Sequence, residues 1–152
     1  VREKAALALF HVDSGDKTAT TFLHEALAGE KLNIYGKVSV ATELLQRNGS
    51  DRAAMRFLLG HEARENVKAM VAAAAFFPQN KGAIARLIAE IDRTAAKPSK
   101  LSQLGHELKR YPEAESVVDE FARHRDLVPD DDREYFDQTV AALRARQIPT
   151  AR

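Results

Sequence analysis

Cysteine and tryptophan are absent from this chain of 152 residues, and glycine (7) and proline (5) are sparse. Without cysteine the chain has no disulfide framework, no thiolate metal site and no cysteine nucleophile. The scarcity of glycine and proline, together with abundant alanine, favours helices over sheets. A lack of disulfides is typical of proteins from a reducing compartment, and we therefore expect a cytoplasmic protein.

Long apolar runs and a strong net charge are also missing. The longest apolar run, residues 67–77, contains Lys68 and is too short to span a bilayer, so we expect no membrane partner. No signal peptide is visible. The formal net charge of +1 argues against a dedicated binder of polyanions. The charge is nevertheless uneven, because residues 61–112 are rich in basic side chains and residues 113–152 in acidic ones.

Histidine precedes glutamate three times, at His24, His61 and His106. The zinc-protease motif needs a second histidine four residues later, so that both rings point at one ion from one helix face. The residues found there instead are Ala28, Glu65 and Arg110. We therefore expect surface or helix-end histidines, with His61 partly buried because it shares a repeat column with apolar residues. We expect no metal site.

A run of carboxylates, Asp130 to Asp132 followed by Glu134, lacks the glycine and the terminal glutamate of an EF-hand loop. We interpret it as the first turn of a helix, where carboxylates compensate the unpaired amides and the helix dipole. Phosphate-binding glycine loops, nucleophile elbows and dinucleotide fingerprints are absent from the sequence. We therefore expect no cofactor and no catalytic residues.

An internal repeat is the main positive feature of the sequence. Residues 15–23 align without a gap on residues 50–58, at an offset of 35, and a further step of 30 reaches residues 82–88. The alignment gives three apolar columns, which are Ala19/Ala54/Ile84, Phe22/Phe57/Leu87 and Leu23/Leu58/Ile88. We expect these columns to be interior positions of three antiparallel helix pairs stacked side by side.

Capping and helix-breaking residues delimit these helices. Ser50 or Asp51 can accept the free amide hydrogens that open one of them. Gly29 lies where another should stop, and Pro78 ends the helix over residues 67–77. The array of three pairs is expected to cover residues 1–93, followed by a linker over residues 94–99.

The last third of the chain, residues 100–148, predicts three more helices within the same domain. The first buries Leu101, Leu104 and Leu108, the second begins near Pro112, and the third begins near Pro129. A solenoid needs a terminal unit with a polar outer face, and these charge-rich helices suit that role. The total is about nine helices.

Two stretches carry a resemblance to a known repeat family. They are Val1-Arg2-x-x-Ala5-Ala6-x-Ala8-Leu9 and Gly15-Asp16-x-x-Ala19-x-x-x-Leu23-x-x-Ala26-Leu27. Together they resemble a HEAT repeat, closest to the short bacterial type that is also found in phycobilisome lyases. The resemblance covers roughly residues 1–92 and is weakest in the third unit. It implies an all-α, right-handed α-solenoid of antiparallel helix pairs, but no particular activity.

The tetratricopeptide repeat is the second choice of family. Leu101-x-x-Leu104-Gly105-x-x-Leu108, followed by Val117, Phe121 and Pro129, resembles one such unit. The step of 30 residues between the second and third units is short for that family, whose period is about 34.

In HEAT arrays the second helix of each pair lines the concave surface. Once the core columns are assigned, the residues left for that face are Lys17, Thr21, His24, Arg52, Arg56, Leu59, Arg86 and Arg93. Stacking would align Thr21, Arg56 and Arg86 along one ridge. Two interpretations remain open: ordinary solvated arginines, or a shallow basic groove for an acidic peptide, a helix or a nucleic-acid backbone.

The leading functional hypothesis is a non-catalytic module, or scaffold, that binds another protein or peptide on this face. The alternatives are nucleic-acid binding by a basic inner face, similar to HEAT-like DNA glycosylases, and a chaperone resembling bilin lyases. The chain begins inside a repeat with no capping helix before Val1. We therefore expect this end to pack on upstream sequence or to self-associate with a second copy.

Overall fold

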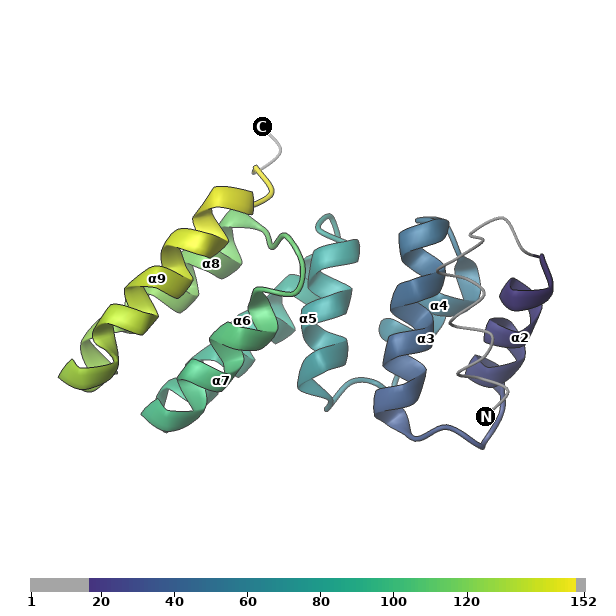
Figure 1. The fold of residues 1–152 in the computed structure, drawn as a ribbon, viewed down its shortest axis with the longest axis horizontal. Coiled ribbons are helices and arrows are strands. Elements are labelled where there is room, and N and C mark those ends of the chain that lie inside the picture. Colours follow the sequence, from purple (N-terminus) through teal and green to yellow (C-terminus); the bar gives the residue numbers. More distant parts are fainter. Residues whose placement is uncertain (1–16, 150–152) are drawn as a thin grey trace. The chain divides into compact units, whose positions relative to one another are not determined.

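The computed structural model describes residues 17–149, and this part of the chain is all-α, as predicted (Figure 1). Its elements are α2 (Lys17–Ala28), α3 (Ile34–Arg47), α4 (Arg52–Leu58), α5 (Val67–Phe76), α6 (Lys81–Ala95), α7 (Pro98–Leu108), α8 (Glu115–Arg123), the 3₁₀ turn η1 (His124–Leu127) and α9 (Asp130–Arg146). Eight of the expected nine α-helices are therefore present. The first expected helix, and with it the N-terminal end proposed to self-associate, lies outside the described residues.

The chain divides into two compact units, residues 1–72 and 73–152, so the boundary falls within α5. The sequence had placed a linker at residues 94–99 instead. There, Thr94 and Ala95 are buried in the last turn of α6, and Pro98 begins α7. The two helices thus follow each other with almost no connecting chain. None of the helices within residues 17–149 is long and apolar enough to cross a bilayer.

Short asparagine and aspartate caps open the helices of the first half of the chain. The side-chain oxygen of Asn33 accepts the amide of Gly36, and that of Asp51 accepts the amide of Ala54, each at 2.9 Å. Asn66 and Asn80 cap α5 and α6 in the same way. Each cap satisfies one of the amides that a helix start leaves unpaired, which explains why these helices begin where they do.

In the first unit, α3 packs against both α2 and α4, and α2 also touches α4. The core contains the predicted columns Ala19/Ala54 and Leu23/Leu58, all four of them buried, together with Ala41, Leu44 and Leu45 from α3. Phe22 and Phe57 are only half-buried. The prediction that the Phe22/Phe57 column is interior was therefore wrong, although the two rings are buried to a similar degree.

The third repeat unit is out of register with the sequence alignment by one residue. The buried positions of α6 are Ala83, Leu87 and Ile91, whereas Ile84 and Ile88 are half-buried. Asn80 caps Ala83 as Asp51 caps Ala54, so the structural step from the second unit is 29 residues rather than 30. One residue turns a helix by about 100°, and the shift therefore changes which side chains of α6 are exposed.

The second unit contains the three predicted C-terminal helices, and each of its four long helices packs against two others. Helix α6 contacts α7 and α8, and α9 contacts the same two helices. The core holds Leu87, Leu101, Leu108, Val117, Phe121, Phe136 and Leu143. The rings of Phe121 and Phe136 stack with centroids 4.8 Å apart, which joins α8 to α9 at the centre of this unit.

The connection between α7 and α8 is extended rather than helical. Helix α8 begins at Glu115, not at Pro112 as expected. The backbone carbonyl of Glu113 accepts the amide of Ile148 at 2.7 Å, and the carbonyl of Ile148 accepts the amide of Glu115 at 3.2 Å. The residues that follow α9 are thereby fastened to the start of α8.

Candidate functional site

The predicted concave-face residues of the first unit line two shallow, open hollows. Lys17 and Thr21 lie on α2 beside Thr18, Phe22 and Glu25. Arg52, Arg56 and Leu59 lie along α4 with Ser50 and Met55, and we call this second surface the α4 hollow. The sequence therefore identified residues that do lie together on the surface of α4. Glu25 places an acidic group in the α2 hollow that the prediction had not considered.

Two of the predicted binding residues in the first unit form bonds within the protein. Thr21 Oγ1 donates to the carbonyl of Lys17 within α2. His24 Nε2 lies 2.6 Å from Asp51 Oδ2, while Asp51 Oδ1 caps α4. Asp51 is buried and His24 is 41% exposed. His24 is thus the link that holds α2 against the start of α4, and it is a weaker candidate for ligand binding than the arginines.

The arginines of the α4 hollow are free in the described part of the chain. Arg52 and Arg56 are exposed, and neither forms an ion pair within residues 17–149. One helical turn separates them, so both guanidinium groups lie on the same side of α4. Met55 and Leu59, both half-buried, supply apolar area beside them. The hollow therefore combines two unneutralised cations with an apolar floor.

The other two predicted arginines, Arg86 and Arg93, both come from α6 and lie in the second unit. Arg86 is half-buried, and the one-residue shift of α6 makes it the repeat equivalent of Phe57, which is also half-buried, rather than of Arg56. Arg93 donates from both Nε and Nη2 to the carboxylate of Glu90. These donors of Arg93 are already bound to a carboxylate within the protein, which makes Arg93 a weaker candidate for ligand binding.

The structure also describes His61 and His106, the other two histidines that precede a glutamate. His106 is exposed, as expected. His61 is exposed as well, which contradicts the expected partial burial. Helix α4 ends at Leu58, so the helical periodicity that linked His61 to the core columns does not extend that far.

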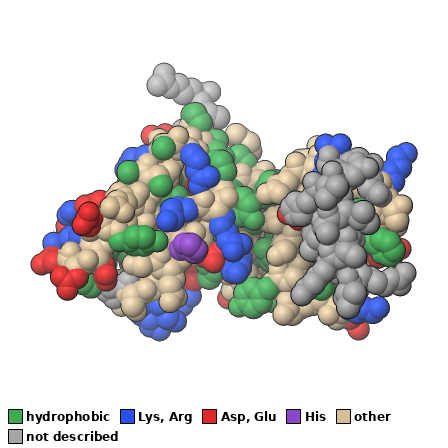
Figure 2. Space-filling view, in the orientation of Figure 1, with side chains coloured by type: hydrophobic (Ala, Val, Ile, Leu, Met, Phe, Trp, Pro, Cys, Tyr) green, Lys and Arg blue, Asp and Glu red, His purple; other side chains and the backbone are tan. Residues whose placement is uncertain are grey.

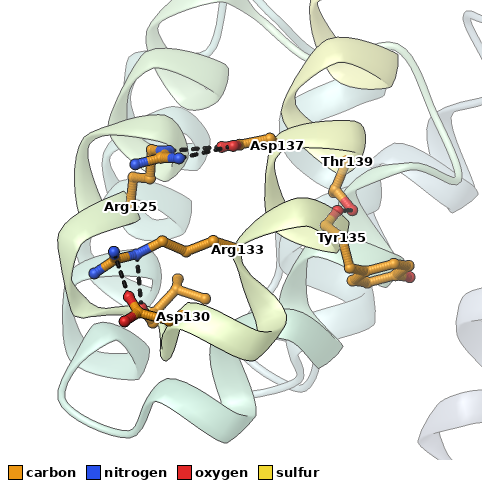
Figure 3. Close-up of polar contacts among 7 residues, drawn as sticks. Arg125, Asp130, Arg133, Tyr135, Asp137 and Thr139 are labelled. Carbon is orange, nitrogen blue, oxygen red and sulfur yellow. Dashed lines mark hydrogen bonds and ion pairs between the residues drawn. The ribbon is translucent and has the colours of Figure 1, made fainter.

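The acidic run at residues 130–132 occupies the first turn of α9, as interpreted from the sequence. Asp130 pairs with Arg133, and Arg125 of η1 binds Asp137 through two parallel bonds of 2.7 and 2.9 Å (Figure 3). Acidic side chains gather on the surface at this end of the second unit (Figure 2). They have local partners and a helix N-terminus to stabilise them, and no cation is needed to account for them.

The sequence did not reveal a cluster formed by Asp92, Glu120 and His124. Asp92 comes from α6, Glu120 from α8 and His124 from the start of η1. His124 Nε2 lies 2.9 Å from Asp92 Oδ1 and 3.5 Å from Glu120 Oε1. The spacing of Glu120 and His124, four residues apart on one helix face, was visible in the sequence. Asp92 is distant in the chain, and only the packing of α6 on α8 brings it close.

The two carboxyl groups of this cluster have opposite pKa shifts. A hydrogen bond with Asp92, together with burial, raises the pKa of Glu120. The same hydrogen bond, together with the bond to His124, lowers the pKa of Asp92. Opposite shifts of this kind are expected where two carboxyl groups lie close enough to hydrogen-bond with each other.

A further carboxyl group, Glu113, is buried between α7 and α8 without a hydrogen-bond partner. Only 1% of the residue is exposed, and neither carboxyl oxygen has a partner. Burial raises the pKa of Glu113 to about 9, so the side chain is protonated at neutral pH.

Comparison of the chain with protein-family models, with curated proteins and with solved structures found no match.

Proposed function

We propose that the first unit is a HEAT-like binding module that uses the α4 hollow to hold an acidic segment of another protein. The observation that carries this proposal is the pair of exposed arginines, Arg52 and Arg56, beside the apolar side chains of Met55 and Leu59. Neither arginine has a carboxylate partner among residues 17–149, which leaves their donors available there, and guanidinium groups bind carboxylates in a two-pronged geometry. The proposal assigns no catalytic role to these residues.

An acidic protein segment fits this hollow better than a nucleic acid does. Phosphate-backbone binding depends on many cations spread over a groove, since each neutralised phosphate contributes through counterion release. The α4 hollow offers two arginines, and the whole chain has a net charge of only +1. Apolar area between two arginines is typical of interfaces in which a few anchoring residues carry most of the binding energy.

The proposal is tested with fluorescently labelled peptides and duplex DNA. The first peptide is helical and rich in glutamate, with leucines spaced one turn apart, and in the second glutamine replaces every glutamate. We expect the first peptide to bind and the second to bind at least about tenfold more weakly, because each lost charge-assisted bond costs about 1.5 kcal/mol or more. Arg52→Ser/Arg56→Ser should abolish the difference between the peptides.

A matched control is Arg47→Ser/Arg64→Ser, which removes the same charge from two exposed positions of the same unit. This variant should bind the acidic peptide almost as wild type does. Equal losses in both double variants would show that only net charge matters and would overturn the site. Tight DNA binding at physiological salt that is lost in Arg52→Ser/Arg56→Ser would overturn the choice of a protein partner.

A further inference from the structure

We propose that Asp92, Glu120 and His124 form a binding site for a divalent transition metal ion, best suited to Zn²⁺, which bridges α6 to α8 in the second unit. This site is independent of the α4 hollow, which lies on a different unit of the chain. Among the described residues, these three are the histidine and carboxylate side chains whose potential ligand atoms gather within 4.8 Å of one another.

The distances from the His124 nitrogen to the two carboxylate oxygens are close to those between ligand atoms of a zinc ion. Ligand atoms about 2.0–2.1 Å from a tetrahedral zinc ion lie about 3.3 Å from one another. His124 Nε2 lies 2.9 Å from Asp92 Oδ1 and 3.5 Å from Glu120 Oε1, values on either side of that separation. Small side-chain rotations would therefore place all three atoms around one ion.

The chemistry of the donors selects the class of metal. One imidazole nitrogen with two carboxylate oxygens suits zinc and its first-row neighbours, whereas Mg²⁺ and Ca²⁺ prefer an all-oxygen shell with more ligands. The side chain of Asp92 is 51% exposed, so a water molecule can reach the ion and complete its coordination. A metal ion would also neutralise the repulsion between two carboxylates that face each other.

Burial and an ion pair with Arg123 hold the Glu120 side chain in place beside His124. Glu120 is largely buried, which limits its conformational freedom. Its Oε2 atom accepts a bond of 2.9 Å from Arg123, while Oε1 faces His124. Oε2 is thus paired with Arg123, and Oε1 is the oxygen that would bind the metal beside His124. Arg123 is a nearby cation that weakens metal binding, but its side chain is 71% exposed and free to turn toward solvent.

The experiment is isothermal titration of the full chain, prepared without an oligohistidine tag, with ZnCl₂, CoCl₂ and MgCl₂. We expect one zinc ion to bind per chain, bound Co²⁺ to give a visible absorption band, and Mg²⁺ neither to bind nor to compete. His124→Gln and Asp92→Asn should each weaken zinc binding at least about tenfold, since each removes a ligand. Zinc should raise the melting temperature of the wild type and not that of His124→Gln.

Two further variants distinguish the loss of a metal ligand from misfolding. Arg123→Gln removes the competing cation and should strengthen zinc binding at least about threefold, an effect that misfolding would not produce. His24→Gln removes the other histidine–aspartate contact and should leave zinc binding unchanged. Zinc binding that persists undiminished in His124→Gln, is lost in His24→Gln, or is absent at micromolar concentrations in the wild type would overturn the site.

Discussion

Gly105 of α7 lies so close to the ring of Phe121 on α8 that a Cβ atom at Gly105 would stand 2.8 Å from Phe121 Cζ. The same Cβ would stand 3.1 Å from Thr139 Cγ2 on α9. Phe121 in turn stacks on Phe136, so its ring cannot easily move away from Gly105. The absence of a side chain at this position therefore permits α7 to approach the ring of Phe121 and the side chain of Thr139.

Gly105→Ala is expected to destabilise the second unit. Overpacking of a close-packed core lowers the free energy of unfolding by about 1–3 kcal/mol. The better helix propensity of alanine raises it by only about 1 kcal/mol. Urea denaturation followed by circular dichroism measures the difference. Gly49→Ala is the control, because no atom lies within 4 Å of a Cβ built there. If Gly105→Ala proved as stable as wild type, the close packing of α7 on Phe121 would be incorrect.

Glu113 should make the protein less stable as the pH rises. Its pKa is about 9 in the folded chain, against an ordinary value of 4.5, so the unfolded chain loses the proton first. The contribution of Glu113 to the free energy of unfolding is therefore most favourable below about pH 4.5 and declines until about pH 9, by up to about 1.36 kcal/mol per pH unit.

Glu113→Gln tests this because glutamine keeps the size and polarity of the protonated carboxyl but does not titrate. The variant and the wild type should differ little at pH 4, and the variant should be more stable by roughly 2–5 kcal/mol at pH 8. The measurement is the free energy of unfolding at several pH values. A difference that does not change with pH would show that Glu113 is solvated or has a partner.

The contact between His24 and Asp51 should contribute to the stability of the first unit. Asp51→Ala loses both the helix cap and the histidine contact and should cost about 1–2 kcal/mol. Asp51→Asn retains a good capping side chain and should cost less. A double-mutant cycle with His24→Ala measures the coupling between the two residues, expected at about 0.5–1.5 kcal/mol. Zero coupling would mean that the 2.6 Å contact contributes nothing to stability.

The register of α6 is testable by comparing neighbouring substitutions. Leu87 is fully buried, so Leu87→Ala should cost about 2–5 kcal/mol, whereas half-buried Ile88 should lose distinctly less on truncation to alanine. Chemical denaturation of both variants gives the comparison. The register derived from the sequence, with Ile88 equivalent to Leu58, predicts that the two costs are similar.

The α4 hollow was predictable from the sequence and the Asp92–Glu120–His124 cluster was not. Arg52 and Arg56 share a face of α4 because of helical periodicity alone, which any single helix obeys. Asp92 reaches His124 only because α6 packs on α8, and a contact between residues 32 positions apart leaves no periodic trace in the sequence. The predicted register of α6 was wrong by one residue, since helical periodicity shows the spacing within a helix, whereas the length of the preceding connection decides which face of that helix packs inward.

The sequence by itself determined that the chain is helical, where most helices begin and end, and which residues of a single helix face the interior. Those properties depend on local energetics, namely helix propensity, capping and the hydrophobic effect acting on one amphipathic face. Only the tertiary structure decided where the compact units divide, how α6 is rotated, and that Glu113 is buried without a partner. Each of these depends on the packing of residues distant in the chain, where shape and close contact rather than periodicity select the arrangement.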